Sequence, residues 1–186
     1  GYEVKLLGIA ERQDDLISVS VQPTMIKSGH PIASVNGVFN AVYVHGEAVG
    51  ETMFYGAGAG ELPTATSVVA DLVSVIKNMK LGVNGRQAQL SYNVTKLKSD
   101  DQIDSKFFLL LHVADRAGVL AQIAQVFSDF DVSIESVMQP STPNLSTTEI
   151  IIITHQASKA AMDKVLNEFE SLSAVKKIKS VYRVEG

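Results

Sequence analysis

The sequence contains no cysteine and carries no long apolar or basic run. Without cysteine the chain cannot form disulfide bonds, thiolate metal sites or a cysteine nucleophile, which fits the reducing cytoplasm. No apolar run approaches the ~20 residues that a membrane-spanning helix needs, so we expect no membrane partner. The net charge of −4 and the lack of a basic block give no support to nucleic-acid binding.

What is present indicates a globular protein. Hydrophobic residues make up 46% of the 186 positions and charged residues 19%, enough for one large core or two small ones. Residues 2–10 already have the pattern of a strand, and no secretory signal opens the chain. Because the chain starts in a strand pattern without a methionine, we expect it to be a piece of a longer protein.

The first half predicts two hairpins and one helix. Residues 2–11 and 16–23 are typical of strands joined by a polar turn, and residues 38–44 and 49–55 form a second such pair. After Gly60, Pro63 suits the first turn of a helix, and Gly82 suits its end. Within that helix the apolar residues recur at helical spacing and predict one apolar face: Val68, Leu72, Val75, Ile76 and Met79.

A polar stretch separates the two halves. Residues 80–105 lack sustained periodicity and are long for a connection within one compact domain. Residues 87–97 are consistent with an extra strand, and we place the linker at residues 98–105. The sequence therefore predicts two domains, at residues 1–97 and 106–186.

The second half predicts the order βαββαβ, which is the ferredoxin-like arrangement. Strands are expected at 107–113, 132–139, 149–155 and 177–184, with a helix after the first and after the third strand and a loop at 140–146. Ser158 is the expected cap of the second helix. Along the last strand, Lys177, Lys179 and Arg183 are expected on one face of an edge strand that their charge protects. The whole chain is thus predicted to be α+β, with a mixed-sheet portion followed by a ferredoxin-like domain.

A glycine-rich loop precedes the predicted helix of the first half. Residues 56–60 have the sequence GAGAG, and glycines at a strand-to-helix turn can let backbone amides approach a phosphate. The dinucleotide fingerprint G-x-G-x-x-G fails in register, because Glu61 or Pro63 occupies its third glycine position. Two interpretations stay open: a phosphate-binding loop, or a tight connection that needs unusual φ angles.

A second turn joins the first strand and first helix of the second half. Residues 115–120 have the sequence DRAGVL, in which Gly118 permits a tight turn. The amides that follow lie at a helix N-terminus, where they can receive a carboxylate. The turn is either a small-molecule site or a simple connection.

Residues 56–65, GAGAGELPTA, together with VVADL at 68–72, resemble the GxGAGxxPTA…DL motif of the homoserine dehydrogenase family. The similarity extends over most of residues 1–95, including HPIASV at 30–35 and FNAV at 39–42. Members of this family oxidise L-homoserine to L-aspartate 4-semialdehyde with NAD(P), on the route to threonine, methionine and isoleucine. The resemblance implies that the backbone of Gly60, with Ala59 and Gly58, lies near the nicotinamide end of the cofactor.

The resemblance also implies that much of such an enzyme is absent from this sequence. No position matches the family's Rossmann domain or its catalytic lysine, so we assign no catalytic residue. We expect no tight NAD(P) binding and no hydride transfer by this chain alone.

Residues 106–186, with DRAGVL and the DVSI of residues 131–134, resemble the ACT domain, an amino-acid-sensing module. In ligand-binding ACT domains this turn and the start of the second strand form a pocket between paired domains. The matching positions here are Asp115, Gly118, Val119, Leu120, Ser133 and Ile134. Many such domains have asparagine where this chain has Asp115 and Ser133, and an aspartate can accept a bond from an amino-acid ammonium group. Threonine is the leading effector by resemblance, and we expect a homo-oligomer, at least a dimer.

Two other functions remain open on the sequence: a free-standing amino-acid-binding regulator, and an ACT module that serves only oligomerisation. The four histidines form no cluster with other ligands at metal-binding spacing, so we expect no metal site.

Overall fold

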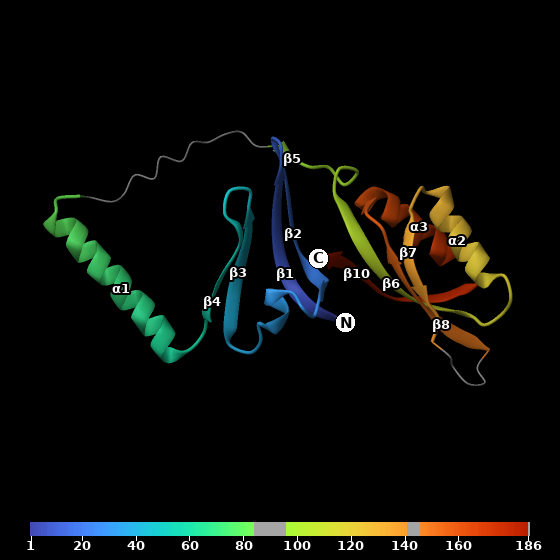
Figure 1. Ribbon diagram of the computed structural model, residues 1–186, viewed down its shortest axis with the longest axis horizontal. Coiled ribbons are helices and arrows are strands. Elements are labelled where there is room, and N and C mark those ends of the chain that lie inside the picture. The colour runs from blue at the N-terminus through green and yellow to red at the C-terminus, as the bar shows by residue number, and fades with distance from the viewer. Residues whose placement is uncertain (84–95, 141–145, 186) are drawn as a thin grey trace. The chain divides into compact units, whose positions relative to one another are not determined.

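The computed structural model describes residues 1–83, 96–140 and 146–185. These residues divide into two compact units: residues 28–83 form one, and residues 1–27 group with the residues from 96 onward in the other (Figure 1). Most of the predicted extra strand at 87–97 lies outside the described residues. So does most of the predicted loop at 140–146.

The second half has the predicted ferredoxin-like order, built from alternating buried and exposed residues. Its four main strands are β6 (Asp104–Ala114), β7 (Ile134–Met138), β8 (Thr147–Thr154) and β10 (Val175–Glu185). The helices are α2 (Val119–Asp129) and α3 (Lys159–Ser171). The strands pair antiparallel in the order β10-β6-β8-β7, so β8 is central as its four isoleucines predict. The α+β fold is confirmed.

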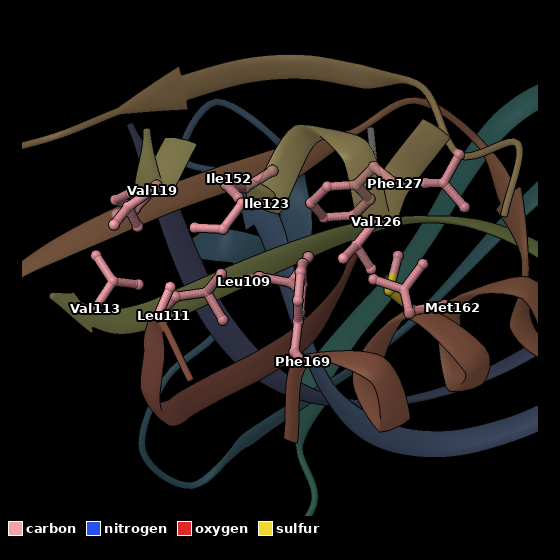
Figure 2. Close-up of a cluster of buried hydrophobic side chains, with 14 of the residues drawn as sticks. Leu109, Leu111, Val113, Val119, Ile123, Val126, Phe127, Ile152, Met162 and Phe169 are labelled. Atoms are coloured by element: carbon pink, nitrogen blue, oxygen red, sulfur yellow. The ribbon is translucent and has the colours of Figure 1, made fainter. Parts of the chain in front are cut away.

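The core lies between one face of this sheet and the two helices. Leu109, Leu111 and Val113 alternate along β6 and are fully buried. Phe127 of α2 meets Phe169 of α3 edge to face, with ring centroids 5.3 Å apart (Figure 2). As predicted, Ser158 caps α3: its Oγ accepts the Ala161 amide at 3.1 Å. This domain therefore buries a continuous apolar core of its own.

The first hairpin is longer than its sequence pattern suggests and joins the same sheet. Strands β1 (Tyr2–Gln13) and β2 (Leu16–Lys27) pair over twelve residues. Strand β2 then pairs in parallel with β10 along Arg183–Glu185, which extends the sheet to β1-β2-β10-β6-β8-β7. Two-residue strands complete it, β5 (Lys96–Leu97) beside β2 and β9 (Ala157–Ser158) beside β6.

The predicted edge strand is therefore wrong. Strand β10 has neighbours on both sides, because a hairpin more than 150 residues away in sequence covers its end. A bulge between Ile178 and Ser180 also shifts the alternation of β10. As a result Lys177 pairs opposite His112 on one face, and Arg183 pairs opposite Phe107 on the core face. Arg183 is buried, with 6% of its surface exposed.

The compact units do not follow the boundaries that the sequence suggests. Residues 1–27 lie in contact with the ferredoxin-like strands, whereas sequence resemblance groups them with residues 28–97. The physical reason is the β2–β10 ladder, which no local pattern in either strand announces.

Residues 28–83 contain a short 3₁₀ helix η1 (Pro31–Ser34), a hairpin of β3 (Phe39–Gly46) and β4 (Gly50–Ala57), and helix α1 (Glu61–Lys80). The predicted hairpin and helix are both present, and Gly82 adopts φ +67° just after the helix. The apolar face of α1 is uncovered: Leu72 is 56% and Met79 is 68% exposed. Among the described residues of this unit, only Ala33 is a buried apolar residue.

In the part of the chain that the structure describes, no helix combines the length and apolarity that a bilayer span requires.

Candidate functional site

The turn between β6 and α2 is shaped by Gly118, which takes the left-handed conformation with φ +86° and ψ −8°. The turn is fastened at its start, where the Ala114 amide donates to Ala174 and the Asp115 amide to Ser146, both at 2.9 Å. Val119 then begins the helix and is buried, while residues 115–118 are exposed. The first-turn amides of α2 lack partners within the helix and carry its positive dipole end.

A hollow of about 300 Å³ lies at this turn. Four of the six predicted effector residues line it: Asp115, Gly118, Val119 and Leu120. An acidic side chain and helix N-terminal amides thus border one space. A zwitterionic amino acid presents the complementary pair, an ammonium group for the carboxylate and a carboxylate for the amides.

The other two predicted residues lie elsewhere in the chain. Ser133 and Ile134, at the start of β7, line a second hollow of about 330 Å³ with Phe127, Ser128 and Asp131. The first hollow lies at the N-terminal end of α2 and the second at its C-terminal end. Within one chain, the structure therefore does not bring the six residues into a single pocket.

Sequence reasoning missed several residues that line the first hollow: Arg116, Gln139, Thr148 and Ile150. Arg116 lies within the DRAGVL motif and could have been included. Thr148 enters because β8 pairs with β6 and sets it opposite Val113. This register is set by the tertiary structure, and no spacing of residues along the sequence predicts it.

Two ion pairs each span an intervening strand of the sheet: Glu149–Lys179 joins β8 to β10 across β6, and Lys106–Glu135 joins β6 to β7 across β8. A hydrogen bond from Lys179 lowers the pKa of Glu149, and nearby His112 adds to the effect. Likewise a hydrogen bond from Lys106 lowers the pKa of Glu135, with a smaller contribution from His155, whose Nδ1 lies 3.8 Å from the carboxylate.

The local structure requires glycine at two positions of the glycine-rich loop, Gly58 and Gly60. A Cβ on Gly58 would lie 1.5 Å from Nδ2 and 2.7 Å from Cγ of Asn40. Gly60 adopts φ +130° directly before α1, and its carbonyl accepts the Thr64 amide at 3.1 Å. This geometry favours the interpretation as a tight strand-to-helix connection. The loop remains exposed, with no side chain larger than a methyl group at positions 57–60.

His30 makes evident local contacts. Nδ1 of His30 accepts the Ile32 amide at 3.2 Å at the start of η1, and the His30 ring lies 4.7 Å from that of Tyr43. Within the described residues, no three histidine, aspartate or glutamate side chains gather closely enough to hold a metal ion.

Comparison with known proteins shows that each half of the chain matches the sequence profile of a known family. Residues 107–174 match the sequence profile of the ACT domain. Together with the βαββαβ fold and the glycine turn, the match identifies the second half as an ACT domain. Residues 1–73 match the profile of homoserine dehydrogenase.

The chain as a whole matches the C-terminal part of homoserine dehydrogenase. It is 49% identical to the enzyme of Bacillus subtilis, with 100% of this chain and 43% of the relative covered. The crystal structure of a homoserine dehydrogenase from Thiobacillus denitrificans superposes with a TM-score of 0.86 at 36% identity, covering 100% of this chain and 43% of that one. The S. aureus enzyme gives a TM-score of 0.62 at 27% identity, covering 100% and 42%. The chain thus spans less than half the length of the relatives that it matches.

Proposed function

We propose that this chain is the C-terminal portion of an NAD(P)-dependent homoserine dehydrogenase, a cytoplasmic enzyme of threonine, methionine and isoleucine biosynthesis. In this proposal residues 1–97 belong to the substrate domain and residues 106–186 are a regulatory ACT domain that binds threonine. Residues 98–105 are the linker between the two. One observation carries the proposal: matches to both family segments within one chain, aligned over its full length with homoserine dehydrogenases.

The bare apolar face of α1 supports the assignment to a larger substrate domain. A helix with one apolar face is stable when that face is covered, and here Val68, Leu72 and Ile76 are each more than half exposed. In the intact enzyme the backbone of Gly60, Ala59 and Gly58 would lie beside the nicotinamide, which accepts the hydride. This chain alone should show no homoserine oxidation with NAD or NADP. Measurable turnover in a spectrophotometric assay would overturn that part.

The effector site is proposed at the β6–α2 turn. Asp115 would accept the effector's ammonium group, and the first-turn amides of α2 would bind its carboxylate. Because Ser133 and Ile134 line a different hollow, they can complete this site only from a second copy of the chain. The separation of the two hollows therefore supports a paired site and a dimer at least.

Isothermal titration of the chain with threonine tests the effector site. We expect saturable binding at millimolar concentration or below, and weaker binding of methionine, isoleucine and lysine. Asp115→Ala should abolish binding, while Ser171→Ala, at the end of α3 and lining neither hollow, should not. If none of the four amino acids binds and the chain is still a dimer, the ACT domain is an oligomerisation module.

A mixing experiment tests the paired arrangement. If the turn comes from one chain and Ser133 from the other, Asp115→Ala and Ser133→Ala each remove both sites of a dimer. In an equal mixture, the heterodimers regain one intact site each. No recovery of threonine binding after subunit exchange would show that each chain binds without its partner's Ser133.

A further inference from the structure

Arg183 is a buried cation that joins the ACT sheet to the N-terminal hairpin. Its side chain is 5% exposed, and its Nη2 donates to Oε2 of Glu11 on β1 at 3.0 Å. Its Nε donates to Glu185 on the same strand. The Glu11 carboxylate also accepts the Ser18 hydroxyl at 3.3 Å.

The backbone connection at the same place is short. Strand β2 pairs with β10 over three residues, whereas β1 and β2 pair over twelve. The hairpin also contacts the segment that leads into the ACT domain, where the Lys98 amide donates to the Ile17 carbonyl at 2.9 Å. The Glu11–Arg183 ion pair is therefore a side-chain link that adds to this short ladder in joining the hairpin to the ACT sheet.

The position of this pair is informative because its partners come from different family segments. Glu11 and Ser18 lie within the dehydrogenase match at 1–73, and Arg183 lies on the last strand of the ACT fold. Strand β10 is also tied to the effector turn. The Ala114 amide at the start of that turn donates to Ala174, and Val175 pairs with Val113.

We propose that the Glu11–Arg183 pair is the link through which the ACT sheet controls the dehydrogenase-matched hairpin. A displacement of the β6–α2 turn on effector binding moves the start of β10, and Arg183 passes that displacement to β1. Separating Glu11 from Arg183 removes one of the two carboxylates that pair with a buried guanidinium, which is unfavourable, so the hairpin follows β10 while the pair is intact. As a mechanism of regulation the proposal rests on the function proposed above; as a mechanical link it is independent of any ligand.

Hydrogen exchange on the unliganded 186-residue chain tests the link. In Arg183→Gln and Glu11→Gln we expect amides of β1 and β2 to exchange at least about tenfold faster, with those of β6 and β8 unchanged. The double variant should lose little more than either single variant, and Arg183→Lys should recover part of the protection. Glu149→Gln is the matched control, because it breaks an ion pair within the ACT sheet alone. Uniform loss of protection in all strands, or none in the hairpin, would overturn the link.

A second arm adds threonine. In the wild-type chain, threonine should change the exchange of the β1 and β2 amides; in Arg183→Gln it should still bind by calorimetry but leave those amides unchanged. If threonine binds and the hairpin responds equally in both proteins, the proposed link is wrong. If no amino acid binds, the proposed effector fails, and the unliganded arm still decides whether the pair joins the two segments.

Discussion

At the scale of single residues, Gly118 determines the shape of the β6–α2 turn. Its φ of +86° is costly for other residues, and a Cβ added there would meet no atom within 4 Å. Gly118→Ala should therefore destabilise the chain through backbone strain alone, by about 1–2 kcal/mol. Gly118→Asn should cost less, because asparagine visits the left-handed region more readily. Urea unfolding measures both, and an equal loss in the two variants would contradict a purely conformational cause.

Glu149 predicts a dependence of stability on pH. The hydrogen bond from Lys179 lowers its pKa below the ordinary value of 4.5, so its contribution is present above that pH and disappears as pH falls through the folded pKa. The melting temperature of Glu149→Gln should lie below that of the wild type at neutral pH. The difference should vanish in acid. Glu170→Gln, on the exposed side of α3, is the control and should show no such pattern.

The residues of the candidate site show which parts of a site the local sequence can predict. Asp115 and Gly118 are recognisable because a strand, a glycine turn and a helix follow one another along the chain. Thr148 is not, because the pairing of β8 with β6 places it at the same hollow. In our proposal Ser133 and Ile134 complete the effector site of a second copy of the chain, and this role stays a prediction.

At the scale of elements, α3 and α1 differ although both have helical apolar spacing. Phe169 of α3 is fully buried against Phe127, so Phe169→Ala should cost about 3–5 kcal/mol. Leu72 of α1 is 56% exposed, so Leu72→Ala should change the unfolding free energy by less than about 0.5 kcal/mol. Chemical denaturation of both variants tests the contrast. A large loss in Leu72→Ala would show that the face of α1 is covered in solution.

Strand β10 shows where local patterns fail. Its charged residues predict an edge, but β2 pairs with it and a bulge carries Arg183 to the core face. The hairpin β1–β2 has a related inversion: Val19 and Val21 are 62% and 73% exposed, while Ser18 and Thr24 are buried. Alternation predicts that a strand has two faces, and only its neighbours decide which face is covered.

At the scale of the whole molecule, the buried core of the described residues is concentrated in the sheet that contains the ACT strands. Cooperative unfolding should therefore reflect that unit rather than the full chain. From about 12–15 cal/mol/K per residue, its 119 residues (1–27 and 95–186) predict a heat-capacity change of about 1.4–1.8 kcal/mol/K. The full chain would give about 2.2–2.8 kcal/mol/K. Differential scanning calorimetry distinguishes the two, and the higher value would show that residues 28–83 unfold with the rest.

The sequence by itself determined the elements, the α+β class, the ACT order and the resemblance to homoserine dehydrogenase. These properties depend on periodicity, caps, glycine turns and contiguous motifs, all of which are local. Tertiary structure decided which strands the first hairpin joins, that Arg183 is buried against Glu11, and that the predicted effector residues line two hollows. Each of these depends on contacts between residues far apart along the chain, where the register of a sheet determines which side chains meet.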